Sequence, residues 1–365
     1  MIDERVPFSF ETAVLRYREE TKGLVSIIIP IYNGEFYMRN ALDSAIAQTF
    51  ENWEAILVDD GSTDKTPEIC AEYVKKDLRF KYICKENNEG LLLARKTGLE
   101  NSKGEFIANL DHDDAYPPQF LEKMFAKMKD GNRDFVWCNF EDLNGKEKVL
   151  YGKDIKVKNC KLNEDKLENC RKYLDFGDAY LWNKLIKRCI YAKVLFPQIK
   201  LIQHEDRIQH LQIVYHSEHA EFVDNISYHL RINSITSTSR AFSVVSKENR
   251  YVYGVIYMVA FYLIAERFFG AQKIEENFAD EFVFLLGYYF LPNKKTFAHY
   301  KIEYAKKFVP IFSKGLAKTK CKDFRWVLLV LACKGFPQPF KIYCNAMRTL
   351  NNVKAKLKRK GAGSK

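Results

Sequence analysis

The stretch Leu24-Val25-Ser26-Ile27-Ile28-Ile29-Pro30 determines the class of fold. This run is β-branched, short, and apolar at consecutive positions, which predicts a strand buried on both faces, as in a parallel sheet. Pro30 ends the strand, and Tyr32-Asn33-Gly34 is typical of a turn. Residues 35–48 then carry apolar side chains at helical spacing, so we expect a helix directly after this strand.

The same alternation continues along the chain. Further apolar strands are predicted at 55–58, 82–84 and 106–110, with helices at about 66–75 and 91–101 between them. Alternating strands and helices are typical of an α/β domain. We therefore predict a Rossmann-like domain with a mostly parallel central sheet.

Acidic residues follow two of these strands. Asp59-Asp60 ends the strand at 55–58, and Asp111-His112-Asp113-Asp114 follows the strand at 106–110. Ligands of such sheets bind beyond the carboxyl ends of the strands, so we expect these groups and Pro30-Ile31-Tyr32 to face one crevice. Clustered carboxylates suit Mg²⁺ or Mn²⁺, which commonly also holds a substrate diphosphate. The alternative is a solvated turn that caps the next helix.

Several motifs together resemble the family 2 glycosyltransferases. In order and at the family's spacing they are Val25–Asn33, Gln48-Thr49-Phe50, Val58–Asp64, Asn88-Glu89-Gly90 with Ala94-Arg95, and Gly104–Ile107 leading into Leu110–Asp114. The resemblance is dense over residues 24–130 and thinner to residue 240. It implies the GT-A fold, a nucleotide-diphosphate sugar donor, and inversion of the anomeric centre in one displacement.

The resemblance also assigns donor-site residues. Pro30 and Tyr32 would line the nucleoside pocket, with the Tyr32 ring on the base, and Asp60 would accept a hydrogen bond from the uracil imide. Arg95 would pair with the diphosphate or the base, or alternatively with a surface carboxylate. Arg231, in a Tyr-x-x-Arg segment at Tyr228–Arg231, would contact the diphosphate.

The metal ligands come from the acidic cluster. Asp113 matches the direct ligand of Mn²⁺ or Mg²⁺, and Asp111 matches a second carboxylate that lies nearer the ribose. His112 stands at the variable position between them and would also reach the nucleotide. His229 stands where the family often has a Tyr or Phe, which leaves open whether it contacts metal or phosphate or only fills space.

The acceptor side is predicted around Gln203-His204-Glu205-Asp206-Arg207. An inverting transfer needs a general base for the acceptor hydroxyl, and the resemblance assigns that role to Asp206. The alternative is an acidic first turn that complements a helix dipole. Trp182, stacked on a sugar, and His204 and Glu205 are the other candidate acceptor residues.

The remaining chain suggests four parts. Residues 1–22 are predicted as an N-terminal helical extension with a helix at 10–20, residues 23–240 as the GT-A domain, 241–340 as a helical region, and 341–365 as a basic tail. The apolar run at 252–265 is shorter than the roughly 20 residues that span a bilayer and predicts a buried helix.

Charge and cysteine usage limit the cellular setting. The net charge is +11 and the tail is purely basic, which favours peripheral contact with an anionic inner membrane face over nucleic acid, for which no module is recognisable. Nine cysteines without a paired metal spacing favour a reducing cytoplasm.

The expected function is therefore transfer of a sugar from a UDP-sugar to a glycan or lipid-linked glycan, in bacterial capsule or lipooligosaccharide synthesis. The alternative is a non-catalytic nucleotide-sugar-binding partner or scaffold protein, which would bind UDP without transfer. A dinucleotide-dependent oxidoreductase is excluded because no glycine-rich phosphate turn follows the first strand.

Overall fold

The computed structural model describes residues 9–143, 159–161, 166, 169–170, 179–201, 204–231, 257 and 260–270. The chain forms two compact units, one of Met1–Ile2 and Phe8–Val244 and the other of Asp3–Pro7 and Val245–Lys365. In the second unit residues 260–269 are helical and Ala260 to Ala265 are buried, within the helix predicted at 252–265. Most of the predicted helical region at 241–340, and the whole tail at 341–365, lie outside the described residues.

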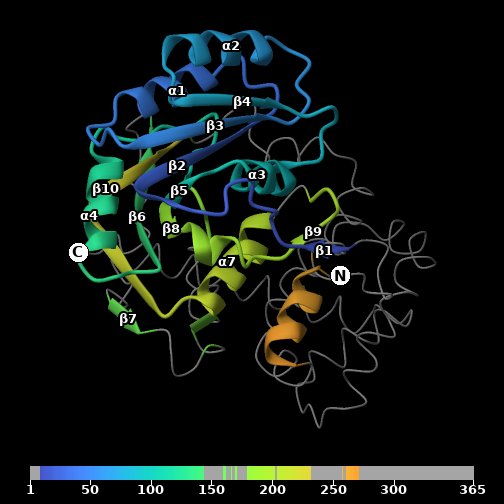
Figure 1. Ribbon diagram of the computed structural model, residues 1–365, viewed down its shortest axis with the longest axis vertical. Coiled ribbons are helices and arrows are strands. Elements are labelled where there is room, and N and C mark those ends of the chain that lie inside the picture. Colours follow the sequence, from blue (N-terminus) through green and yellow to red (C-terminus); the bar gives the residue numbers. More distant parts are fainter. Residues whose placement is uncertain are drawn as a thin grey trace, which may run out of the picture. The chain divides into compact units, whose positions relative to one another are not determined.

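A mixed sheet forms the centre of the first unit (Figure 1). The described strands run in the order β4 (Phe80–Cys84), β3 (Trp53–Asp59), β2 (Thr21–Ile31), β5 (Gly104–Asn109), β8 (Lys184–Lys187), β6 (Phe135–Asp142), β10 (His219–Leu230) and β7 (Asn159–Lys161). The first four are parallel, β10 is parallel to β6, and β8 and β7 run antiparallel to their neighbours. The predicted mostly parallel sheet is confirmed, with two reversed strands.

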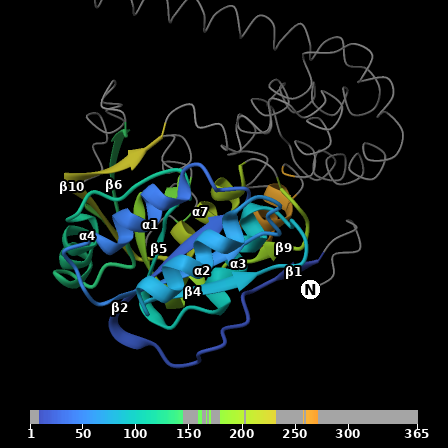
Figure 2. The ribbon, with the colours of Figure 1, turned by 90° about the horizontal axis from the view of Figure 1, so that it is seen from above.

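Helices cover both faces of this sheet (Figures 1 and 2). One face carries α1 (Met38–Ile46), α2 (Thr66–Lys76) and α4 (Phe120–Lys129), whose buried side chains share one core cluster with β2, β3 and β5. On the other face α3 (Leu91–Glu100) packs on β2 and β3, and α6 (Arg188–Tyr191) packs on β5. Helix α7 (Glu205–His216) lies against α3 and α6, which brings the predicted acceptor-side residues next to the sheet.

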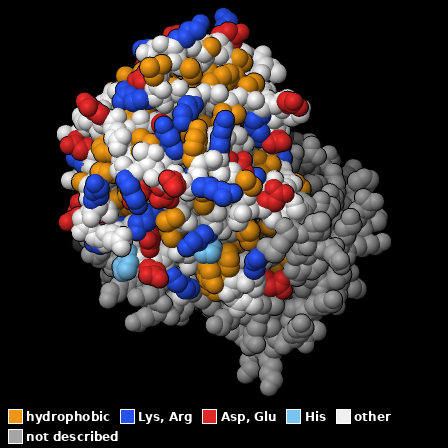
Figure 3. All heavy atoms as spheres, viewed as in Figure 1, with side chains coloured by type: hydrophobic (Ala, Val, Ile, Leu, Met, Phe, Trp, Pro, Cys, Tyr) orange, Lys and Arg blue, Asp and Glu red, His pale blue; other side chains and the backbone are white. Residues whose placement is uncertain are grey.

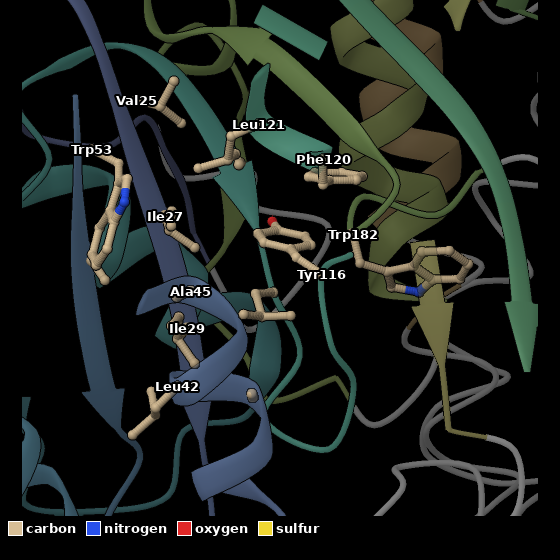
Figure 4. Packing of buried hydrophobic residues seen from close by; sticks show 14 of the residues in the cluster. Val25, Ile27, Ile29, Leu42, Ala45, Trp53, Tyr116, Phe120, Leu121 and Trp182 are labelled. Carbon is tan, nitrogen blue, oxygen red and sulfur yellow. The ribbon is translucent and has the colours of Figure 1, made fainter. Parts of the chain in front are cut away.

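Strand β2 is buried on both faces, as its composition predicts. Val25, Ile27 and Ile29 belong to the same core cluster as Leu42 and Ala45 of α1 (Figure 4). Ile28 points to the opposite face, where a Cβ added to Gly98 would lie 2.4 Å from its Cγ2, so the missing side chain lets α3 approach the strand closely. Full burial of one such Val or Ile stabilises the fold by about 1.5–3 kcal/mol.

The predicted helix at 10–20 is wrong. The short strand β1 (Phe10–Glu11) pairs with β9 (Phe196–Pro197), and no helix lies within residues 9–20. The backbone N–H of Val14 donates to the Glu100 carboxylate (3.0 Å), and that of Arg16 donates to the Glu100 carbonyl (2.7 Å). These donors therefore bond to the end of α3 and cannot form the i to i−4 bonds of a helix.

Neither the described helices nor the face drawn in Figure 3 points to a membrane-spanning segment or to a binding face of one charge sign. The face in Figure 3 mixes basic and acidic side chains over the first unit. Every helix within the described ranges is too short or too polar to cross a bilayer. Membrane contact through the basic tail stays a prediction.

Candidate active site

The carboxyl ends of β3, β2 and β5 lie side by side, because these strands are neighbours in the parallel part of the sheet. The Asp60 N–H donates to the Ile31 carbonyl (2.8 Å), and the Leu110 N–H donates to the Ile28 carbonyl (3.0 Å). The three segments predicted to share one crevice therefore adjoin at one sheet edge. Pro30 is buried within β2, whereas the Tyr32 ring is 42% exposed beyond the strand, where it can meet a ligand.

The turn after β2 is hydrogen-bonded to the segment that follows β3 and packs against His112 of the acidic cluster. The Asn33 N–H donates to Ser62 Oγ (2.9 Å), and the Gly34 N–H donates to Thr66 Oγ1 (2.8 Å). A Cβ on Gly34 would lie 3.0 Å from His112 Cδ2, so only glycine allows the imidazole to pack this closely. His112 Nε2 is buried and has no hydrogen-bond partner in the described part of the chain, which leaves a polar atom for a ligand at this edge.

Asp60 is buried at the end of β3 and lies against the loop that precedes α3. Its carboxylate accepts hydrogen bonds from the N–H groups of Glu89 (3.1 Å) and Gly90 (2.7 Å), and Lys85 Nζ lies 3.0 Å from Oδ1. Neighbouring Asp59 accepts the Ser62 N–H (2.8 Å) and so caps the turn around Gly61. The sequence motif did not identify Lys85 as a neighbour of Asp60, because this contact depends on how the loop between β4 and α3 folds.

Arg95 is the centre of the site. Its guanidinium is fully buried; Nη2 donates to Asp111 Oδ1 (3.0 Å), and Nη1 donates to Asp206 Oδ1 and lies 3.6 Å from Glu205 Oε1. One cation from α3 thus joins the predicted metal motif to the predicted base. Of the alternatives left open by the sequence, the structure shows pairing with protein carboxylates, and these are partly or fully buried instead of lying on the open surface.

The charges in this cluster do not cancel. One guanidinium and three carboxylates would carry a net charge of −2 if all were ionised. Burial raises the pKa of Glu205 to about 8, the Asp206 charge adds to the shift, and Arg95 opposes it. Glu205 therefore keeps its proton at neutral pH. Burial lowers the pKa of His204, which has a left-handed backbone, to about 4, so this imidazole is neutral.

The end of β10 and Arg231 after it are hydrogen-bonded to the acidic cluster. Buried Asp114 accepts the Tyr228 hydroxyl (2.8 Å) and the Arg231 N–H (2.7 Å). Arg231 Nε donates to the Asp113 carbonyl (2.9 Å), and its guanidinium lies 4.6 Å from the centre of the Tyr37 ring. Asp114 and Tyr228 were not predicted as site residues. The Tyr-x-x-Arg segment was the sequence feature that pointed to Tyr228. Only the fold shows that this segment contacts Asp114.

His229 has a protein partner. Its Nε2 lies 3.0 Å from Glu141 Oε1 on the adjacent strand β6. Its backbone exchanges hydrogen bonds with Ala115, directly after the acidic cluster (3.0 and 3.1 Å). His229 therefore joins β10 to the acidic cluster through its backbone, and its ring pairs with an acid outside that cluster.

Trp182 lies in the core, and the prediction that it stacks on a sugar is wrong. Its ring is stacked between Tyr180 (centroids 4.7 Å apart) and Tyr228 (4.5 Å) and is only 4% exposed. Figure 4 shows it close to β10, among the buried side chains. Because both faces of the indole are covered, no sugar can stack on it. Tyr180, 40% exposed, is the accessible ring of this stack.

Replacing Trp182 by Ala is therefore expected to cost about 3–5 kcal/mol of stability, as for other large core aromatic residues. Urea unfolding followed by circular dichroism would measure the loss. Trp182→Phe is the matched control, and its free energy of unfolding should lie within about 1.5 kcal/mol of the wild-type value. An unchanged urea midpoint in Trp182→Ala, with weaker acceptor binding, would restore the sugar-stacking role.

The carboxylates fit a shared metal better than a metal enclosed by protein. The described residues contain no group of three or more His, Cys, Asp or Glu arranged to hold a metal ion. Asp111 and Asp113, at one edge of the site, would supply hard oxygen ligands to such a metal. Mg²⁺ and Mn²⁺ sites of nucleotide enzymes take one or two carboxylates and complete the shell with phosphate and water.

Comparison with known proteins agrees with this geometry. Residues 26–195 match the model of glycosyl transferase family 2. The putative glycosyltransferase EpsH of Bacillus subtilis is 35% identical over 219 residues, which cover 57% of this chain and 61% of EpsH. The glycosyltransferase GlyA of Streptococcus pneumoniae is 32% identical over 215 residues, which cover 57% of this chain and 30% of GlyA. The chain thus spans three fifths of one relative and under a third of the other.

A solved structure shares the fold. Residues 1–349 of TarS from S. aureus, in complex with UDP-GlcNAc, superpose with a TM-score of 0.62 over 90% of this chain and 92% of that one. The sequence identity is 18%, so this likeness concerns the fold alone. The expected GT-A fold is confirmed. By the family match and these relatives, the chain contains a glycosyl transferase family 2 domain over residues 26–195.

Proposed function

We propose that the chain is an inverting glycosyltransferase that transfers a sugar from a UDP-sugar to a hydroxyl of a glycan or lipid-linked glycan. The observation that carries the proposal is the Arg95 bridge, which joins a donor-side carboxylate, Asp111, to an acceptor-side carboxylate, Asp206. A transferase needs both halves within reach of one anomeric carbon. A non-catalytic binding protein would need only the donor half.

In the donor half, Pro30 and Tyr32 would bind the nucleoside, and Asp60 the uracil imide. Asp113, with Asp111, would hold Mn²⁺ or Mg²⁺, and the metal would neutralise the charge that grows on the departing diphosphate. His112, whose buried Nε2 has no hydrogen-bond partner among the described residues, would contact the nucleotide. Arg231, which its Nε holds beside Asp113, would contact the diphosphate.

In the acceptor half, Asp206 would take the proton of the attacking hydroxyl. Arg95 holds Oδ1 and leaves the other carboxylate oxygen for the acceptor, in the way that a third group orients a catalytic base. The Asp206 side chain is 17% exposed, whereas Glu205 is more deeply buried and keeps its proton at neutral pH. Asp206 is therefore the better base, with His204 and Glu205 beside the acceptor.

The proposed pathway is assembly of a bacterial surface polysaccharide, either capsule or lipooligosaccharide. Segments 182–187 and 228–231 resemble bacterial members of this kind. Lipid-linked acceptors would also explain the basic tail at 341–365, which we propose contacts an anionic inner membrane face.

Calorimetric titration with UDP, with and without Mn²⁺, tests the donor half. The wild type should bind UDP at least about tenfold more tightly with Mn²⁺, and Asp113→Ala should lose that gain, because one carboxylate ligand is gone. Asp43→Ala, a change of an exposed carboxylate on α1, is the matched control and should bind like the wild type. Metal-independent UDP binding in both proteins would refute the metal assignment.

A further inference from the structure

Lys85 is a buried cation at the base end of the proposed donor site. It directly follows β4, its side chain is 11% exposed, and its Nζ lies 3.0 Å from Asp60 Oδ1 and forms an ion pair with Glu89. An ammonium has three N–H donors, and within the described residues two carboxylates lie against this one. One N–H donor of Lys85 is therefore available for a further acceptor.

Asp60 has unused capacity beside it. Oδ1 faces Lys85 and accepts the Glu89 N–H, whereas within the described residues Oδ2 accepts the Gly90 N–H alone. A carboxylate offers about four acceptor positions, two on each oxygen. One position therefore remains on Oδ2, in the same carboxylate whose Oδ1 faces the Lys85 donor. Together they present an acceptor and a donor side by side to an incoming ligand.

We propose that Lys85 selects the donor's base by donating a hydrogen bond to a carbonyl oxygen of uracil, beside the N3–H that Asp60 accepts. This inference rests on the proposed UDP-sugar function and extends it to the choice of base. Uracil has a carbonyl on each side of N3–H, so its edge complements the Asp60–Lys85 pair in either orientation.

Other bases fit this pair less well. Cytosine has no hydrogen on N3 and carries an amino group at C4. It would therefore place the acceptor N3 against the Asp60 carboxylate and the amino donor against the Lys85 ammonium. Guanine presents O6 beside N1–H as uracil presents a carbonyl beside N3–H, but on the other side it carries an amino donor at N2, for which Asp60 offers no second free position on Oδ2 within the described residues. Sites built to hydrogen-bond one pattern strongly reject ligands that lack it, because buried groups are then left unpaired.

Glu89 occupies the place of the base in the free protein. Its side chain is 52% exposed and pairs with Lys85 from the solvent side. An exposed carboxylate held by one ion pair contributes little stability and can move at small cost. The uracil carbonyl would therefore replace the Glu89 carboxylate at the ammonium.

The test is calorimetric titration of the full chain with Mn²⁺ and four probes: UDP, CDP, 2-thio-UDP and 4-thio-UDP. Sulfur is a weaker acceptor than oxygen, so one thio-analogue should bind the wild type about fivefold more weakly than UDP, and CDP at least about tenfold more weakly. In Lys85→Met the thio penalty should vanish. Glu89→Gln, which alters the other partner of Lys85, should keep it.

The outcomes separate the two proposals. If the wild type binds no uridine nucleotide, the proposed function fails and this inference fails with it. If the wild type binds UDP but neither thio-analogue is penalised, or the penalty persists in Lys85→Met, only the role of Lys85 is refuted. A wild type that binds both thio-analogues as tightly as UDP refutes the contact with Lys85 even if Lys85→Met does not fold.

Discussion

Replacing Asp206 by Asn is expected to lower the turnover number of sugar transfer by about a thousandfold, within the 10²–10⁴ range of general-base catalysis. The Asn carbonyl can still accept the Arg95 hydrogen bond, so the fold and the position of the side chain should be kept. What is lost is the capacity to take the proton of the acceptor hydroxyl. UDP release with an accepted glycan would measure the rate, and calorimetry should give UDP affinity within about threefold of the wild type.

Glu205→Gln is the matched control for this experiment. Glu205 is adjacent to Asp206, contacts the same guanidinium, and keeps its proton at neutral pH, so Gln mimics its protonated state. We expect a loss of less than about tenfold in turnover at pH 7, since no ionised base is removed. Near-normal transfer by a folded Asp206→Asn protein, with a large loss of transfer in Glu205→Gln, would identify Glu205 as the base in place of Asp206.

Replacing Arg95 by Met is expected to destabilise the first unit by about 3–5 kcal/mol. The substitution fills a similar volume but leaves the carboxylates of Asp111, Glu205 and Asp206 buried together without their cation. Removing one partner of a buried ion pair has a cost of this size, because the remaining charge is uncompensated. Urea unfolding followed by tryptophan fluorescence would measure it. Arg95→Lys, which keeps the charge but loses the fork that reaches two carboxylates, should lose less.

The cost of Arg95→Met should depend on pH, with a defined sign. Glu205 binds its proton more tightly in the folded protein, where its pKa is about 8, than at its ordinary value of 4.5. Its protonation therefore stabilises the fold fully below pH 4.5, and this contribution is lost as pH rises through 8. Without the Arg95 cation, ionisation of the neighbouring carboxyl groups in the folded protein is less favourable than in the wild type. The deficit of Arg95→Met should thus grow from pH 4.5 to 8, and a deficit that is constant across this range would contradict the charge explanation.

The donor half was predictable from sequence because its residues are local. Asp60 and Asp113 directly follow strands that a simple apolar pattern reveals, and parallel neighbours bring their ends to one edge. The position of Asp206 at the start of a helix was likewise predictable, since α7 follows the expected spacing. The helix at 10–20 was not, because its backbone donors bond to Glu100, which lies about 85 residues further along the chain.

The sequence by itself determined the α/β class, the mostly parallel sheet and the identity of the acidic groups, because each depends on apolar periodicity or on motifs within a few residues. The tertiary structure alone decided what those groups contact. It enclosed Arg95 among three carboxylates from two separate segments, placed Trp182 between two tyrosines, and set Lys85 against Asp60. Burial and charge pairing depend on distances between segments that are remote in the chain, and no local pattern records those distances.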